Sequence, residues 1–112
     1  MMQHRQLGFL NGSYDELHED RTKTGGVIRL STSSTTVFTE ALNSNGIVEW
    51  NGNLDLQPSS KPVQLDGDYK YVGKADQGQH KVIVLAESGY LTIEGQNAQP
   101  GAKSFHMVWK KT

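Results

Sequence analysis

The chain has 112 residues, enough for one compact domain and too few for a second hydrophobic core. Hydrophobic residues make up 35% of it, charged residues make up 21%, and the net charge is −1. This balance gives no strong field that would attract nucleic acid or acidic lipid. Cysteine is absent, which excludes disulfide frameworks, thiol catalysis and thiolate zinc sites.

The sequence also bears on location. No apolar run approaches the roughly 20 residues that a membrane-spanning helix needs. Residues 1–10 lack the apolar stretch of a signal peptide. We therefore expect a soluble, cytoplasmic protein with no membrane partner, folded as a single domain over residues 1–112.

Apolar and polar residues alternate with a period of two along most of the chain, a pattern typical of strands with one buried face. Short segments predict strands at 9–14 and 27–31, and longer alternating runs predict strands over 47–57, 63–73, 90–95 and 104–110. A continuous apolar run at 82–85 predicts one more strand. Turn signals separate these runs at 24–26, 43–46, 57–62, 75–79, 87–89 and 96–101.

The segment 33–45 is the one place where a helix could form. Four of its apolar residues would share a helical stripe: Val37, Phe38, Ala41 and Leu42. Against this, residues 35–39 are all β-formers, and Asn45-Gly46 before Ile47 is a strong hairpin signal. We favour a strand and hairpin over a short helix here.

Seven or eight strands joined by short turns must cover their apolar face, either in a sandwich or in a closed barrel. Two glycines favour closure, because Gly52 and Gly67 fall in the apolar phase of their strands beside Trp50 and Tyr69. Glycine on an inner face allows a sharp bend without a side-chain clash; the alternative is that each glycine marks a bulge. The fold class predicted is all-β, a small antiparallel up-and-down barrel of about seven to eight strands.

Two short stretches add a resemblance. Asn11-Gly12-Ser13-Tyr14 near the start and Met107-Val108-Trp109-Lys110 at the end resemble the way calycin-type barrels open and close. This group includes the avidins and lipocalins. The chain departs from the lipocalin opening Gly-x-Trp, because Tyr14 stands where the tryptophan would be. The resemblance implies a meander barrel and assigns no binding residue to this chain.

The candidate binding residues are aromatic. Five rings fall in the apolar phase of their predicted strands: Trp50, Tyr69, Tyr71, Phe105 and Trp109. Buried tyrosine O–H and tryptophan N–H groups need hydrogen-bond partners. The rings therefore indicate either a cavity for a polar ligand or a solid core whose hydroxyls reach the rim. Arg29 lies between Ile28 and Leu30 and should point outward. If the inward and outward residues of this short strand were reversed, Arg29 would be a candidate to bind an anionic group.

Catalytic and metal chemistry have weaker signals. The four histidines (His4, His18, His80 and His106) are scattered, and no nucleophile elbow or phosphate loop occurs. The run 18–20 has metal-ligand residue types but lies in a polar connection, and Asp66 and Asp68 indicate an exposed strand face. We therefore assign no catalytic residue, metal or cofactor, and His106 is the best lone candidate for a base.

These observations favour a non-enzymatic barrel that binds a small polar or aromatic ligand, a nucleotide included, or a partner at one barrel mouth. Trp50, Tyr69, Tyr71 and Trp109 would line the site, with Arg29 as an outlying candidate. One alternative is a module with a filled core that binds a protein partner or itself. Another is a small barrel enzyme, an isomerase or hydrolase. We expect no nucleic-acid partner, because the predicted rings face inward and the charge is balanced.

Overall fold

The computed structural model describes residues 7–57, 63–84 and 89–112. Its elements are a 3₁₀ turn, η1 (Gly8–Leu10), and eight strands: β1 (Gly12–His18), β2 (Lys23–Ser33), β3 (Thr36–Leu42), β4 (Val48–Leu56), β5 (Gln64–Tyr71), β6 (Gln77–Val84), β7 (Tyr90–Asn97) and β8 (Ser104–Lys111). Within these ranges, no helix combines the length and hydropathy that a membrane crossing requires.

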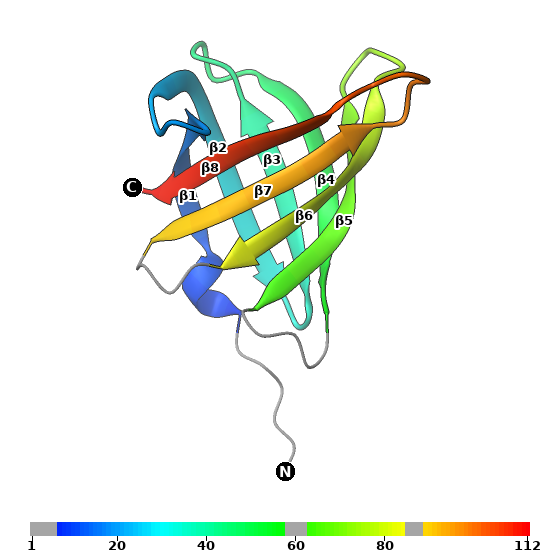
Figure 1. Cartoon of the computed structure of the whole chain (residues 1–112). Helices are drawn as coiled ribbons and strands as arrows, with labels where there is room; N and C mark the ends of the chain where they lie inside the picture. The colour runs from blue at the N-terminus through cyan, green and yellow to red at the C-terminus, as the bar shows by residue number, and fades with distance from the viewer. Residues whose placement is uncertain (1–6, 58–62, 85–88) are drawn as a thin grey trace.

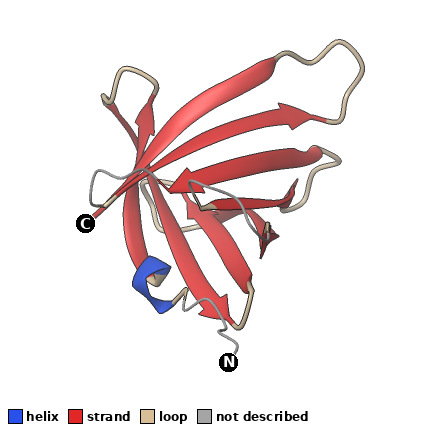
Figure 2. Ribbon diagram, turned by 60° about the horizontal axis from the view of Figure 1, so that its bottom comes forward, coloured by secondary structure: helices blue, strands red, loops and turns tan. Residues whose placement is uncertain are grey.

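The eight strands form one closed barrel in sequence order (Figures 1 and 2). Each strand pairs antiparallel with the next, and β1 closes the circle by pairing with β8, for example Tyr14 with Lys111. The predicted all-β, up-and-down barrel is confirmed. Because β1 and β8 are paired, none of the described strands leaves an open sheet edge.

The predicted alternation is confirmed along the barrel wall. In β4, Trp50, Gly52 and Leu54 are buried between more exposed polar neighbours, and β7 buries Leu91 and Ile93 in the same way. The segment 33–45 contains strand β3 and a turn before Ile47, so the strand interpretation is confirmed and the helix excluded.

The inner glycines mark places where two backbones approach closely. A Cβ on Gly52 would lie 1.8 Å from the carbonyl oxygen of Asp68, and one on Gly67 would lie 1.8 Å from that of Asn53. Between the pairs Asn51–Lys70 and Leu54–Gly67 the ladder is interrupted. The register is the same on both sides of this gap, so the glycines mark a close approach of the two backbones rather than a bulge between β4 and β5.

Four local predictions were wrong, one of them being the turn at 75–79, of which residues 77–79 belong to β6. Residues 8–10 form η1 rather than the start of a strand, and β1 continues to His18, which was expected in a loop. The predicted turn at 24–26 lies inside β2, where Gly25 has a φ of 93° beside a bulge, and the hairpin turns before Lys23. A bulge uses the same glycine signal as a turn.

Some predictions fall on residues outside the described ranges. Of the turns predicted at 57–62 and 87–89, residues 58–62 and 87–88 lie outside the described residues, as does Leu85 of the run 82–85.

The element η1 closes one end of the barrel. Its flanking Leu7 and its last residue, Leu10, are 3% and 1% exposed and belong to the hydrophobic core. The Tyr14 hydroxyl donates to the Leu10 carbonyl over 2.9 Å, and Lys111 Nζ donates to the Phe9 carbonyl over 2.7 Å. These bonds fix the turn across the barrel mouth, and we call this the closed end.

The β1–β2 hairpin lies over the outer side of the barrel. Leu17 pairs with Val108 on the outer face, yet both are buried. The guanidinium carbon of Arg21, at the hairpin tip, lies 4.2 Å from the centre of the Tyr90 ring on β7. The hairpin therefore crosses β8 and covers a small apolar patch that the inner core does not include.

Candidate functional site

The four predicted aromatic site residues come together inside the barrel. Ring centres lie 5.7 Å apart for Trp50 and Tyr69, 6.3 Å apart for Trp50 and Trp109, and 6.2 Å apart for Tyr69 and Tyr71. Phe105 joins them at 6.0 Å from Tyr69. The tilted and edge-on arrangements are those that aromatic pairs prefer. We call these residues, together with His80, the aromatic cluster.

His80 lies at the centre of this cluster, and the sequence analysis did not identify it. Its ring centre is 5.3 Å from Tyr69, 5.6 Å from Trp50 and 6.0 Å from Trp109. The sequence did contain a signal for the inward position of His80, because His80 and Val82 are two residues apart and share the inward phase of β6. Burial lowers the pKa of His80 to about 4, an effect that nearby Asp68 opposes. The imidazole is therefore neutral at neutral pH.

Glycines make room for these rings. Gly67 and Gly95 flank His80 on the neighbouring strands, and the Phe105 ring fills the space where a Gly95 side chain would be. The Tyr69 ring covers Gly78 in the same manner. An aromatic ring beside a cross-strand glycine packs the inner layer without a clash.

Three buried polar atoms in the barrel interior have no hydrogen-bond partner among the described residues. They are Thr39 Oγ1, His80 Nε2 and Trp109 Nε1, in residues that are 0%, 4% and 1% exposed. An unsatisfied buried donor or acceptor costs about 1–3 kcal/mol. Two of the three belong to rings of the aromatic cluster, so a polar partner there would recover this cost.

The end opposite η1 is where this cluster reaches solvent, and we call it the open end. Tyr71 and Met107 are half-buried there, and Trp50 is 9% exposed. Burial is the largest cause that raises the pKa of Tyr71, followed by the negative charge of Glu49, then Tyr69, Glu16 and Asp76. The backbone places two of these acidic residues beside Tyr71, because the Tyr71 N–H donates to the Asp76 carbonyl and the Val72 N–H donates to the Glu49 carbonyl, each over 2.9 Å.

Glu16 is the inward member of these three carboxylates. It pairs with Trp109 across β1 and β8 and accepts a 2.6 Å hydrogen bond from Thr24 Oγ1. The side chain is half-buried, and its other carboxylate oxygen bonds to no described residue. Glu16 was not among the predicted site residues, although Tyr14 and Glu16 alternate with Asp15 in the inward phase.

Two other candidates lie away from the aromatic cluster. Arg29 is on the outer face, as its phase predicted, 3.7 Å from Glu40, so it does not join the other four site residues. His106 is also on the outer face, with Nε2 3.2 Å from Glu94. In the part of the chain that the structure describes, no three His, Asp or Glu side chains are grouped to hold a metal ion.

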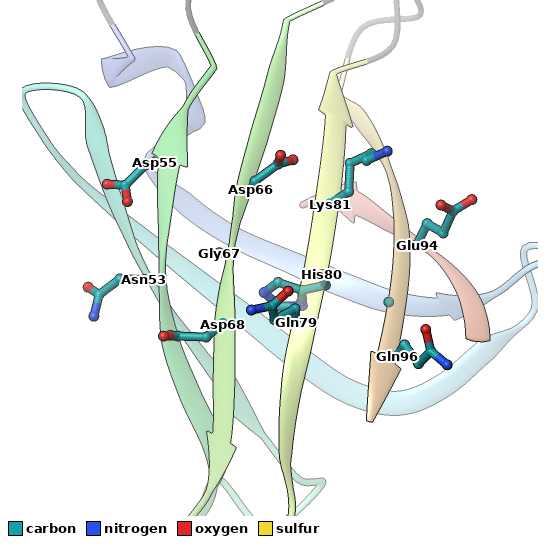
Figure 3. A pocket seen from close by; sticks show the side chains of 11 residues that line it. Asn53, Asp55, Asp66, Gly67, Asp68, Gln79, His80, Lys81, Glu94 and Gln96 are labelled. Carbon is teal, nitrogen blue, oxygen red and sulfur yellow. The ribbon is translucent and has the colours of Figure 1, made fainter. Parts of the chain in front are cut away.

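A second candidate surface lies on the outside of strands β4 to β7. Two hollows of about 490 Å³ and 850 Å³ share Asn53, Asp68, Gln79 and Gln96 and so form one groove. Figure 3 shows its polar side chains rising from four neighbouring strands. The alternation of β4 and β5 predicted that these side chains face outward but gave no sign of a concave surface.

Comparison with models of protein families, with curated proteins and with solved structures gives no match to this chain. The architecture and the two candidate surfaces therefore carry the functional argument by themselves.

Proposed function

We propose that the protein is a non-enzymatic binding module that takes a small ligand with an aromatic or apolar body at the open end of the barrel. The observation that carries this proposal is the set of unsatisfied atoms inside the barrel, above all His80 Nε2 and Trp109 Nε1. A ligand with a polar group that reaches these atoms would recover their hydrogen bonds.

The two ends of the barrel support entry from one side. Leu7 and Leu10 cover the closed end, whereas Tyr71 and Met107 are only half-buried at the open end. A body stacked on Tyr71 and Trp50 would bury apolar surface that water now contacts.

The charges at the open end favour a cationic ligand. Glu16, Glu49 and Asp76 act on Tyr71, and an aromatic face beside carboxylates attracts an ammonium group. The protein's own Lys74 already lies in this position, with Nζ 5.7 Å from the centre of the Tyr71 ring. A ligand amine would replace that lysine, and Glu16 would accept one of its hydrogen bonds.

The barrel topology agrees with the calycin-type resemblance of the sequence, which we retain as part of the proposal, together with a cytoplasmic location. Binding rather than catalysis is proposed because the three described histidines, His18, His80 and His106, lie on different strands, and the last two have separate surroundings. His80 contacts rings, and His106 pairs with Glu94 on the outside.

Titration of tryptophan fluorescence with phenethylamine tests the proposal, with phenylacetate as the probe of opposite charge. We expect phenethylamine to change the emission of Trp50 and Trp109 at micromolar to millimolar concentration, and phenylacetate to bind at least about tenfold more weakly. Tyr71→Ala and Glu16→Gln should each weaken phenethylamine binding by about tenfold.

The matched control is Glu19→Gln, which removes a carboxylate in the exposed β1–β2 turn and should leave binding unchanged. Equal affinity for both probes would contradict the charge argument. Failure of every amine, carboxylate and nucleotide tested to alter the tryptophan signal would contradict binding at the open end.

A further inference from the structure

The outer groove across β4–β7 differs from the rest of the barrel surface. On other parts of the outer face, two pairs of charged side chains lie close together, Arg29 with Glu40 and Lys23 with Asp15. In the larger hollow, seven of the fifteen lining residues are asparagine or glutamine, and the only charged ones are Asp68 and Lys70. The larger hollow is therefore rich in amides, whereas the smaller hollow carries most of the charged side chains of the groove.

Several of these amides have unused hydrogen-bonding capacity. The side chains of Asn51, Asn53, Gln77 and Gln79 bond to no other described residue. Each carboxamide offers two donor hydrogens and one acceptor oxygen. Their positions on β4 and β6 place them on opposite sides of Asp68, whose carboxylate adds further acceptors.

The wall of the groove is fixed in place. Gln96 Nε2 donates to the Ala102 carbonyl over 3.0 Å, and Gln99 Nε2 donates to Asp76 over 3.1 Å. These bonds hold the β7–β8 turn against the groove. The lining also includes Gly52 and Gly78, which carry no side chain to fill the groove. Such a preformed site loses little entropy on binding.

The charge and topology restrict what could bind. The smaller hollow has four carboxylates (Asp55, Asp66, Asp68 and Glu94) against one lysine, so it repels phosphate chains and other anions. An extended peptide gains most of its affinity by adding a strand to a free sheet edge. The described strands offer no such edge, because the barrel is closed.

One apolar residue lies beside the groove. Phe38 is 40% exposed and pairs with Asn53 across β3 and β4 on the outer face. Phe38 is not among the residues that line the two hollows, so it lies at the border of the groove. Sugar rings present hydroxyl groups at their edges and apolar C–H groups on their faces, so an exposed ring beside amides and carboxylates matches both parts.

From these features we infer that the outer groove is a second binding site for a neutral, hydroxyl-rich chain such as an oligosaccharide. It lies on the outer face of the barrel wall, where Tyr69 and His80 of the aromatic cluster also contribute to its lining. Carboxamides exchange paired donor and acceptor bonds with neighbouring hydroxyls. Asp66 and Asp68 accept further bonds from hydroxyl groups, and Phe38 contacts the face of one sugar ring. The groove crosses four strands that lie about 4.8 Å apart, which is room for several sugar units.

The experiment is an NMR titration of the ¹⁵N-labelled protein with cellohexaose and with maltohexaose, with a heparin hexasaccharide as the anionic probe. We expect at least one neutral hexasaccharide to shift the side-chain amide signals of Asn53 and Gln79, while the indole signals of Trp50 and Trp109 stay in place. The double variant Asn53→Ala/Gln79→Ala should weaken that binding at least about tenfold.

The control is Asn45→Ala, which removes an exposed carboxamide in the β3–β4 turn and should not change saccharide binding. Both double-variant positions are exposed, so loss of fold is not expected, and the backbone spectrum verifies this. Stronger binding of the heparin fragment, unchanged affinity in the double variant, or no amide shift at millimolar concentration of either neutral sugar would each overturn the inference. Shifts confined to Trp50 and Trp109 would also overturn it, because they would place the sugar at the open end.

Discussion

The two ends of this barrel are built from different residues on the same eight strands. At the closed end, aliphatic side chains such as Leu10 and Leu65 are fully buried, and the Tyr14 hydroxyl has a partner in the Leu10 carbonyl. At the open end, rings alternate with glycines, Tyr71 is half-buried, and the cluster beneath it holds unsatisfied polar atoms.

The difference links the closed end mainly with stability and the open end with the proposed binding. Close-packed aliphatic residues contribute through buried apolar area and leave no polar group without a partner. The aromatic cluster stabilises the barrel less efficiently, because His80 Nε2 and Trp109 Nε1 remain buried without hydrogen bonds. Buried polar groups without partners lower the stability of the free protein, and a ligand can supply the hydrogen bonds that they lack.

The largest effect is expected where the aromatic cluster depends on a glycine. Gly67→Ala places a Cβ 1.8 Å from the carbonyl oxygen of Asn53, and a backbone atom cannot move aside as a flexible side chain can. We expect the free energy of unfolding to fall by about 4 kcal/mol, at the upper end of single-substitution effects. Urea unfolding followed by tryptophan fluorescence measures the change.

Gly8→Ala at the closed end is the matched control. A Cβ on Gly8 meets no atom within 4 Å, so the stability should change by less than about 0.5 kcal/mol. A Gly67→Ala variant as stable as the Gly8→Ala variant would show that β4 and β5 can separate at this point, and that their close approach does not need glycine.

A smaller effect on stability is expected when the pH is lowered, because His80 belongs to the aromatic cluster. His80 has a pKa of about 4 in the folded protein against an ordinary value of 6.5, so the unfolded chain binds the proton more tightly. This contribution to stability is fully present above pH 6.5 and is lost as the pH falls towards 4. Between pH 7 and pH 5 we expect a loss of about 2 kcal/mol from this group.

The measurement compares urea unfolding of the native protein and of His80→Gln at both pH values. Glutamine does not titrate, so the difference in pH dependence between the two proteins isolates the histidine. Equal pH dependence in both proteins would mean that the imidazole of His80 is solvated, which would also weaken the argument for unsatisfied atoms in the aromatic cluster.

The fold was predictable because its main signal is local. Alternation along β4, β5, β7 and β8 placed Trp50, Tyr69, Tyr71 and Trp109 inward, and the structure brings these rings together. Each of these predictions needed only the period of one strand.

The remaining site residues could not be found this way, because they depend on which strands become neighbours. His80 and Glu16 have inward phases in short, polar segments, and only the barrel closure places them beside Trp109. The outer groove is less visible still, because its lining combines residues of four strands and alternation along one strand says nothing about the shape of that surface.

The smallest expected effect comes from making the same substitution at both ends. Tyr14→Phe removes a buried 2.9 Å hydrogen bond and leaves the Leu10 carbonyl without that donor, so we expect a loss of about 1 kcal/mol. Tyr71→Phe should change stability by less than about 0.5 kcal/mol, because the Tyr71 hydroxyl bonds to no described residue and the ring is half-buried. Burial raises the pKa of Tyr14 to about 12, so ultraviolet titration can verify that its hydroxyl is shielded before the unfolding curves are compared. Equal losses for the two variants would mean that the open end is as tightly packed as the closed one, and a ligand would then have no room to reach the aromatic cluster.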